Sequence, residues 1–445
     1  MNMKPKRMQS VWKLAILLPV AAALSASCSS NKEAATKAPE TAATPDIMSQ
    51  PIELTHYYMY SDRTYEQFME ASGNIIRKKY PNITFKYIRN EKGSSLEEIA
   101  ATKVKVDFFG GVPADIDKLR TVGLLGDATD LVAKTKYDLG KLEQTSINGI
   151  KLLSDGKVTG LPIKINSATL FYNKDMFDKF GVPYLTDTMT WEDILDTARK
   201  LTRVDGGMTY LGIGLQIANL LTVNETAPRL VNPQTHKAEL NTDYWKRMFE
   251  RIAPSMAMVN DTADKTVLAN YGNAIAKFRN EGTVGIMVAN NSAYPQPGAS
   301  WAINWDIAQF PDYKDLPKAG PSPSPYSFYL SANSPNREAA FLAIASLLTP
   351  EAQVEQAQKG QVSSLQDKSI NNSIGSGVAE LKGKNAKGLV PKRYGEMIAA
   401  DKYINAANSA LTTALTEVLT GKKDVNTALR DGQELADQKI SELPK

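Results

Sequence analysis

Strand-like and helix-like apolar patterns alternate along the first part of the chain. Strands are expected over 51–60, 83–87 and 104–109, and helices over 62–80, 95–101 and 113–121. In the second strand every other residue is apolar, whereas the first helix repeats its apolar residues at three- and four-residue spacing. Because each strand is followed by a helix, the pattern predicts an α/β lobe with a mainly parallel sheet.

A second strand–helix unit begins after a bend at Gly160-Leu-Pro162, where glycine and proline interrupt the pattern. The β-prone segment Ser167–Tyr172 predicts a strand. Asn173 is placed to cap the helix that follows, and Gly181 is a suitable residue to end it. Further strands are expected over 210–215, 305–311 and 327–332, with helical character over 240–281 and in most of the chain after 336.

The helix that begins after Thr190 carries the strongest local signals in this region. Thr190 and Asp193 have the spacing of a capping box. One helical face is apolar throughout, and we interpret its first residue, Trp191, as the core anchor of this helix. That face comprises Trp191, Ile194, Leu195, Ala198 and Leu201.

These pieces, in this order, closely resemble the signature of bacterial extracellular solute-binding proteins of family 1, the sugar-binding class of ABC importers. The matching pieces are Gly160-Leu-Pro162, Tyr172-Asn-Lys-Asp175, Gly181-Val-Pro183, Thr190-Trp-Glu192 and Lys200-Leu-Thr202. Looser similarity at 278–288 and 305–311 extends the resemblance over essentially all of 51–445. The resemblance implies a two-lobed α/β fold like that of the type II periplasmic binding proteins, with a ligand cleft between lobes joined by crossover segments.

The crossovers predict how the chain divides. Residues 1–27 are expected to be a signal peptide and 28–50 a flexible tether. The N-terminal lobe is expected to comprise 51–162 and 311–332, and the C-terminal lobe 166–308 and 336–445.

The first 27 residues have the features of a secretion leader. Four basic residues precede a short apolar stretch that ends just before Cys28, the single cysteine of the chain. A lone cysteine cannot form an internal disulfide. We interpret Cys28 as the lipidated N-terminus of a lipoprotein held at the extracytoplasmic face of the cell membrane. In lipoprotein signals a leucine usually stands where this chain has Ser25.

Composition excludes several classes of function. The leader holds four of the 52 Lys and Arg residues and none of the 48 Asp and Glu residues, which leaves 48 of each charge in the mature chain. This balance gives no electrostatic case for nucleic-acid binding. Two histidines and one cysteine predict no metal site, and the chain has no P-loop or Gly-x-Gly-x-x-Gly motif. We therefore predict a protein that is not an enzyme and uses no cofactor.

Ligands of open α/β sheets bind beyond the carboxyl ends of the strands. The residues at those positions combine aromatic faces with amide and hydroxyl groups, which suits a carbohydrate. The candidate ligand-binding residues are Tyr58, Tyr60, Ser61, Asp62, Phe109, Gly110, Gly111, Lys164, Asn166, Gln216, Asn290, Asn291, Tyr294 and Tyr326.

The resemblance and the candidate residues predict a monomeric, lipid-anchored receptor that delivers a mono- or oligosaccharide to the permease subunits of an ABC transporter. Two alternatives stay open at this point. The same fold could bind a peptide or another polar solute, because the acidic residue that often grips sugar in this family is not obvious in the sequence. A secreted hydrolase acting on glycans could use paired carboxylates, but none stands in a recognisable catalytic frame.

Overall fold

The computed structural model describes residues 47–215, 223–224, 230–232, 234–256, 271–296, 298–315, 318–397 and 402–443. Its strands are β1 (Ile52–Tyr58), β2 (Ile83–Arg89), β3 (Phe108–Gly111), β4 (Gly160–Asn166), β5 (Ala168–Asn173), β6 (Arg203–Asp205), β7 (Met208–Leu215), β8 (Val223–Asn224), β9 (Val284–Asn290), β10 (Trp305–Ala308), β11 (Gly320–Pro321) and β12 (Ser324–Leu330). Its α-helices are α1 (Tyr65–Phe68), α2 (Asn74–Lys79), α3 (Leu96–Thr102), α4 (Asp115–Thr121), α5 (Thr129–Lys134), α6 (Gln144–Leu153), α7 (Lys174–Phe180), α8 (Trp191–Leu201), α10 (Asp243–Met256), α12 (Tyr271–Ala276), α13 (Arg337–Ser346), α14 (Pro350–Gln358), α15 (Lys402–Leu419) and α16 (Val425–Ser441).

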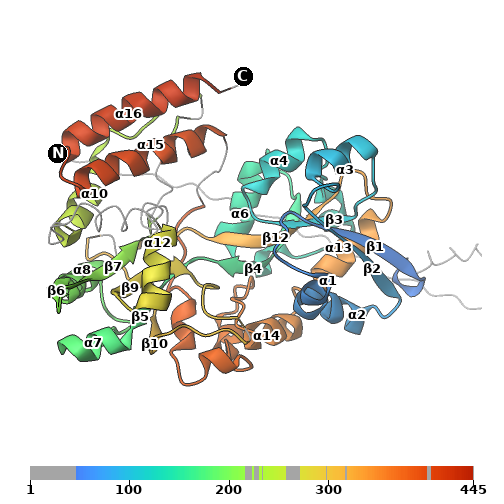
Figure 1. Cartoon of the computed structure of the whole chain (residues 1–445). Helices are drawn as coiled ribbons and strands as arrows, with labels where there is room; N and C mark the ends of the chain where they lie inside the picture. Colours follow the sequence, from blue (N-terminus) through green and yellow to red (C-terminus); the bar gives the residue numbers. More distant parts are fainter. Residues whose placement is uncertain are drawn as a thin grey trace, which may run out of the picture. The chain divides into compact units, whose positions relative to one another are not determined.

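The first sheet has the strand order β2-β1-β3-β12-β4. The strands β2, β1 and β3 are parallel, as predicted, whereas β12 runs antiparallel to both β3 and β4. Two apolar cores cover its faces: α3, α4 and α6 pack on one side, and α1, α2 and α13 on the other (Figure 1). The predicted α/β class is confirmed.

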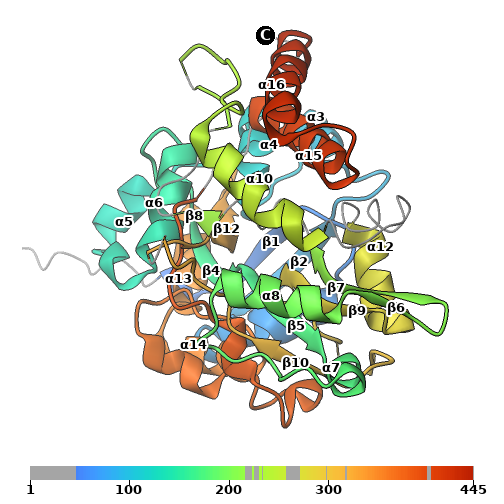
Figure 2. The ribbon, with the colours of Figure 1, turned by 90° about the vertical axis from the view of Figure 1, so that its left-hand side faces the viewer.

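The second sheet has the strand order β10-β5-β9-β7-β6, with β7 and β9 parallel and the other pairs antiparallel. Helix α8 packs on β7, and α10 contacts α8, α15 and α16 (Figure 2). A single core of buried side chains, which we refer to as the second core, joins these elements.

The local signals of helix ends are confirmed. The Asn173 side chain accepts a hydrogen bond from the Met176 amide, and Gly181 ends α7 in the left-handed conformation. Thr190 and Asp193 form the predicted capping box. Trp191 is fully buried and packs in the core of the second sheet with Ile194, Ala198 and Leu201, and Leu195 is buried as well.

The bend predicted at Gly160-Leu-Pro162 is instead the first part of strand β4 (Gly160–Asn166). This strand lies at the edge of the first sheet, where its neighbouring strand is β12, and near its end Lys164 and Ile165 also contact Ser363 and Val362. An edge strand tolerates a proline because one side of it needs no backbone donor, which explains why Pro162 does not break the strand.

Strand β3 begins at Phe108 rather than Val104 and includes Gly110 and Gly111. Before Phe108 the Thr55 amide donates to a carboxylate oxygen of Asp107, at 2.7 Å, instead of to a backbone carbonyl. The side chain of Asp107 therefore replaces a ladder hydrogen bond and delays the start of the strand.

The chain passes from the first sheet to the second directly between β4 and β5, and returns between β10 and β12. The third crossing differs from the expected one near residue 336. Helices α13 and α14 pack in the core of the first sheet, because α13 buries an almost continuous apolar face there. Ile370 still packs in the core that α13 forms with the first sheet, whereas Ile374 packs in the second core. The chain therefore crosses after α14. Within the expected segment 311–332, Tyr313 and Ala319 belong to the second core.

Candidate functional site

The carboxyl ends of β1 and β3 meet the start of β12 and the end of β4 at one edge of the first sheet. The register places Tyr58 opposite Gly110, and Tyr326 opposite Lys164. Most candidate residues of the N-terminal lobe thereby come together, although they come from four separate segments of the chain. We refer to this edge, defined by Tyr58, Tyr60, Arg63, Lys164 and Tyr326, as the tyrosine edge.

Three tyrosines form the centre of the tyrosine edge. The ring centroids of Tyr58 and Tyr60 are 5.4 Å apart, and those of Tyr58 and Tyr326 are 6.5 Å apart. Tyr58 and Tyr326 are buried, whereas Tyr60 is half-buried. The phenol ring combines an apolar face with a polar tip, so the cluster can offer both stacking and hydrogen bonds to a ligand.

Two carboxylates orient two of these phenols. The Tyr58 hydroxyl donates to Asp62 at 2.7 Å, and the Tyr60 hydroxyl donates to Asp115 at 2.6 Å. Burial, with the Asp115 carboxylate as the next cause, holds the pKa of Tyr60 well above its ordinary value. The Tyr60 phenol is therefore neutral at physiological pH and keeps its proton to donate. Ser61 is exposed, and its carbonyl accepts a hydrogen bond from Arg89 at 3.2 Å.

Two cations lie against the Tyr326 ring. The Arg63 guanidinium carbon is 5.2 Å from the centre of this ring and 5.5 Å from that of Tyr58. The Lys164 ammonium is 5.8 Å from the same Tyr326 centre. Burial, and secondly the charge of Arg63, lower the pKa of Lys164 to about 7. Lys164 and Asn166 are both half-buried, and their spacing places them on the same face of β4.

The glycine pair of β3 leaves room for the Tyr326 ring. A Cβ atom at Gly110 would lie 2.3 Å from the Tyr326 hydroxyl oxygen and 2.6 Å from Nε2 of His56. A Cβ at Gly111 would lie 2.6 Å from a carboxylate oxygen of Asp115. A side chain at Gly110 would therefore displace Tyr326, and a side chain at Gly111 would displace Asp115, the acceptor of the Tyr60 hydroxyl. The preceding residue, Phe109, is fully buried in a core of the first sheet, so a ligand cannot reach its ring in this conformation.

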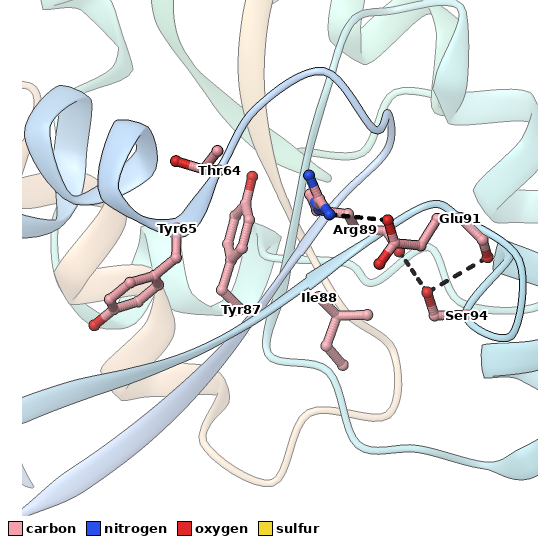
Figure 3. A pocket seen from close by; sticks show the side chains of 7 residues that line it. All are labelled: Thr64, Tyr65, Tyr87, Ile88, Arg89, Glu91 and Ser94. Carbon is pink, nitrogen blue, oxygen red and sulfur yellow. Dashed lines mark hydrogen bonds and ion pairs between the residues drawn. The ribbon is translucent and has the colours of Figure 1, made fainter.

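A pocket of about 410 Å³ lies next to the tyrosine edge, at the carboxyl end of β2. Its lining comes from the start of α1, from β2 and from the loop after β2 (Figure 3), and comprises Thr64, Tyr65, Tyr87, Ile88, Arg89, Glu91 and Ser94. The Tyr87 ring stacks on that of Tyr58 at 6.4 Å, and its hydroxyl donates to the Arg63 carbonyl at 3.2 Å. Tyr87 therefore connects the pocket to the tyrosine edge.

Hydrogen bonds order the far wall of this pocket (Figure 3). Arg89 forms an ion pair with Glu91 at 2.9 Å. The Ser94 hydroxyl donates to the Arg89 carbonyl at 2.7 Å. The charges of Arg89 and Glu91 thus balance each other within the wall.

The second sheet holds the remaining candidates at the carboxyl end of β9. The Asn291 side chain is buried and donates to the carbonyls of Ile165 and Leu389, both at 3.2 Å. The backbone amide of Asn291 donates to the Ser167 carbonyl at 2.8 Å, so Asn291 joins the second sheet to the β4–β5 crossing. Asn290 is half-buried and accepts hydrogen bonds from the amide and hydroxyl of Ser292.

Tyr294 is buried in the second core, and its hydroxyl lies 3.5 Å from the Gly360 carbonyl oxygen. Gln216 lies outside the described residues, as does Cys28.

Sequence reasoning missed three residues of this region: Arg63, Tyr87 and Asp115. Arg63 and Tyr87 could have been found from strand ends, because the first follows β1 within five residues and the second lies near the end of β2. Asp115 is in the first turn of α4, and its importance depends on contact with Tyr60, 55 positions earlier. No local pattern signals that contact.

Within the described part of the chain, no group of three His, Cys, Asp or Glu residues is arranged to hold a metal ion. None of the helices there is both long enough and apolar enough to cross a membrane. The chemistry that the tyrosine edge offers is therefore that of stacking, hydrogen bonding and positive charge.

Two sheets, each with a polar edge and joined by crossing segments, define a two-lobed binding protein. Residues 60–354 match the model of the bacterial extracellular solute-binding protein family, and the chain belongs to this family. A binding protein of Brucella abortus is 30% identical over 125 residues, a segment that covers 27% of this chain and only 29% of that relative.

Solved structures show the same fold. A sugar transporter from Rhizobium etli, in an open conformation, is 21% identical, with a TM-score of 0.67 over 88% of this chain and 100% of that one. An ABC substrate-binding protein from Listeria monocytogenes, in complex with cycloalternan, is 18% identical, with a TM-score of 0.62 over 87% and 99%. A cyclic α-maltosyl-1,6-maltose binding protein from Arthrobacter globiformis is 15% identical, with a TM-score of 0.65 over 88% and 99%.

Proposed function

We propose that this protein binds a carbohydrate outside the cytoplasmic membrane and delivers it to the permease of an ABC transporter. The observation that carries the proposal is the tyrosine edge in a member of the solute-binding family. Sugar rings stack on aromatic faces, and their hydroxyls need directed donors and acceptors. The proteins of similar fold described above support it, because their names refer to sugar transport or sugar ligands.

The binding site in this proposal is the tyrosine edge together with the partly exposed groups of the second sheet. The first sheet would contribute Tyr60, Asp62, Lys164 and Asn166. The second would contribute Asn290; Gln216, which the sequence also suggests, lies outside the described residues. We further propose that the protein acts as a monomer and that the two lobes close on the ligand by rotation about the crossing segments.

A thermal-shift screen against monosaccharides, oligosaccharides, sugar alcohols and short peptides tests the class of ligand. A ligand at one hundred times its dissociation constant adds about 2.7 kcal/mol to the free energy of unfolding, which a melting experiment readily detects. We expect at least one carbohydrate to raise the melting temperature. Stabilisation by peptides and by none of the carbohydrates would contradict the proposal.

Binding is expected to occur without turnover, since we propose that the protein is not an enzyme. A carbohydrate identified in the screen should be recovered unchanged after prolonged incubation with residues 29–445. Chromatography of the incubation mixture is the measurement, and a boiled sample is the control. Cleavage products that appear only with the native protein would favour a hydrolase instead.

Cys28 is proposed to anchor the protein to the membrane through lipid. Cys28→Ala should therefore release the protein into the medium or leave it as an unprocessed precursor. Metabolic labelling with a fatty acid checks this directly, and Ser27→Ala is the matched control because it changes the neighbouring residue only. Fatty-acid label retained by Cys28→Ala would show that another residue carries the lipid.

A further inference from the structure

Arg63 and Lys164 differ from the other basic residues near the tyrosine edge because neither forms an ion pair with an acidic residue in the described part of the chain. Lys118 pairs with Asp115 at 3.0 Å, and Arg89 pairs with Glu91 at 2.9 Å. Among the described residues, neither the Arg63 guanidinium nor the Lys164 ammonium forms an ion pair or a hydrogen bond. Their contacts are with the rings of Tyr58 and Tyr326.

The nearby carboxylates already have other partners. Asp62 is exposed and accepts the Tyr58 hydroxyl. Asp115 is buried and accepts from the Tyr60 hydroxyl, the Val112 amide and Lys118. The neighbouring end of β4 carries the neutral Asn166. Among the described residues, Arg63 and Lys164 are therefore the two basic groups of the tyrosine edge that form no ion pair with a carboxylate, and burial keeps Lys164 only partly charged near pH 7.

Placing two like charges together in a half-buried site is unfavourable unless something compensates for it. Both cations lie against one ring, at 5.2 Å and 5.8 Å from its centre. A guanidinium binds a carboxylate through two parallel hydrogen bonds, and a neighbouring ammonium adds a second charge-assisted contact. An anionic ligand group would supply the missing charge.

We propose that the tyrosine edge selects an acidic carbohydrate, one whose carboxylate lies between Arg63 and Lys164. The proposal rests on the proposed function, since it names the class of carbohydrate bound at that site. The aromatic residues around the cations, with Tyr60 half-buried beside them and Tyr65 and Tyr87 in the adjoining pocket, provide surfaces for the sugar ring. The cations provide the selection for charge.

The first test compares matched pairs of acidic and neutral sugars. Calorimetric titration uses glucuronate with glucose, galacturonate with galactose, and α-1,4-digalacturonate with α-1,4-galactobiose, at 150 mM salt. We expect the acidic member of at least one pair to bind at least tenfold more tightly than its neutral counterpart. If sugars bind and the neutral member binds as tightly as or more tightly than the acidic member in every pair that binds, the inference is overturned while the proposed function stays intact. Binding of none of the sugars, with stabilisation by peptides, would instead overturn the proposed function.

The second test uses variants. Lys164→Met and Arg63→Gln should each weaken binding of the acidic sugar at least tenfold, and should weaken binding of its neutral counterpart by a clearly smaller factor. Lys157→Met is the matched control: it removes a positive charge just before β4, where the side chain is 60% exposed, and should change neither. Equal losses for acidic and neutral sugars would show that the two cations only support the structure.

Proton uptake on ligand binding gives a third test, because a purely structural role of Lys164 would not cause such uptake. With a pKa of about 7, Lys164 is mostly neutral at pH 8 in the free protein. A bound carboxylate favours the charged ammonium and raises this pKa, so binding should take up a fraction of a proton.

The other groups around Lys164 should not contribute to this uptake. Tyr58 and Tyr326 stay neutral because their pKa values are raised, and buried His56, with a pKa lowered to about 3, stays neutral as well. Titration at pH 8 in two buffers of different ionisation enthalpy measures the uptake. It should disappear in Lys164→Met, and equal uptake by that variant would contradict the assignment.

Discussion

Replacing Trp191 with alanine should lower the free energy of unfolding by about 3–5 kcal/mol, the range typical of large aromatic side chains removed from a core. Trp191 is fully buried at the start of α8. Its ring stacks on Tyr313 with centroids 5.8 Å apart and meets Phe310 edge to face at 5.2 Å. The cavity would therefore open where α8 packs on the chain that follows β10.

The loss should come from packing alone, because the indole Nε1 has no hydrogen-bond partner among the described residues. Denaturant unfolding followed by circular dichroism measures it. Val204→Ala is the control in the same lobe: Val204 is 70% exposed, and its change should stay within about 0.5 kcal/mol. Ligand affinity of Trp191→Ala, measured below its melting temperature, should equal that of the unmodified protein. Unchanged stability would mean that Trp191 does not anchor the core.

Interactions between residues close in sequence explain why the helix ends and the buried face of α8 in the C-terminal lobe could be predicted. The cap at Asn173, the left-handed glycine at 181 and the capping box of α8 each depend on residues within four positions of one another. Apolar periodicity then places one face of α8 in the core without further information. These signals remain readable because tertiary contacts reinforce the local preference and do not oppose it.

Long-range pairing explains what could not be predicted. Strand β4 forms because β12, more than 150 positions later, supplies its partner, and no local pattern at Gly160-Leu-Pro162 indicates that partner. The apolar pattern of α13 does not indicate which core the helix joins; in the structure it packs with the first sheet, and the third crossing therefore comes later in the chain. Strand ends correctly grouped Tyr58, Gly110 and Lys164 with Tyr326, whereas the burial of Phe109 and Tyr294 depends on the cores around them.

Asp115→Ala is expected to have the largest effect among changes at the tyrosine edge. The Asp115 carboxylate is 1% exposed, and it accepts the Tyr60 hydroxyl at 2.6 Å and the Val112 amide at 3.0 Å. Leaving a buried donor without a partner costs about 1–3 kcal/mol for each group. We therefore expect the free energy of unfolding to fall by about 2–4 kcal/mol, and carbohydrate affinity to fall as well, because Tyr60 loses the bond that orients it.

A double-mutant cycle with Tyr60→Phe separates the role of Asp115 in orienting Tyr60 from its other contacts. Tyr60→Phe removes one hydroxyl and should lose about 1 kcal/mol of stability, the typical net value of one hydrogen bond. If the Tyr60–Asp115 bond is what orients the ring, the double variant should be more stable than the sum of the two single losses implies, by about 0.5–3 kcal/mol. Asp115→Asn keeps an acceptor oxygen and should retain more ligand affinity than Asp115→Ala. Strict additivity of the two changes in unfolding and in calorimetric titration would show that Asp115 supports the α4 turn alone and does not position Tyr60 for the ligand.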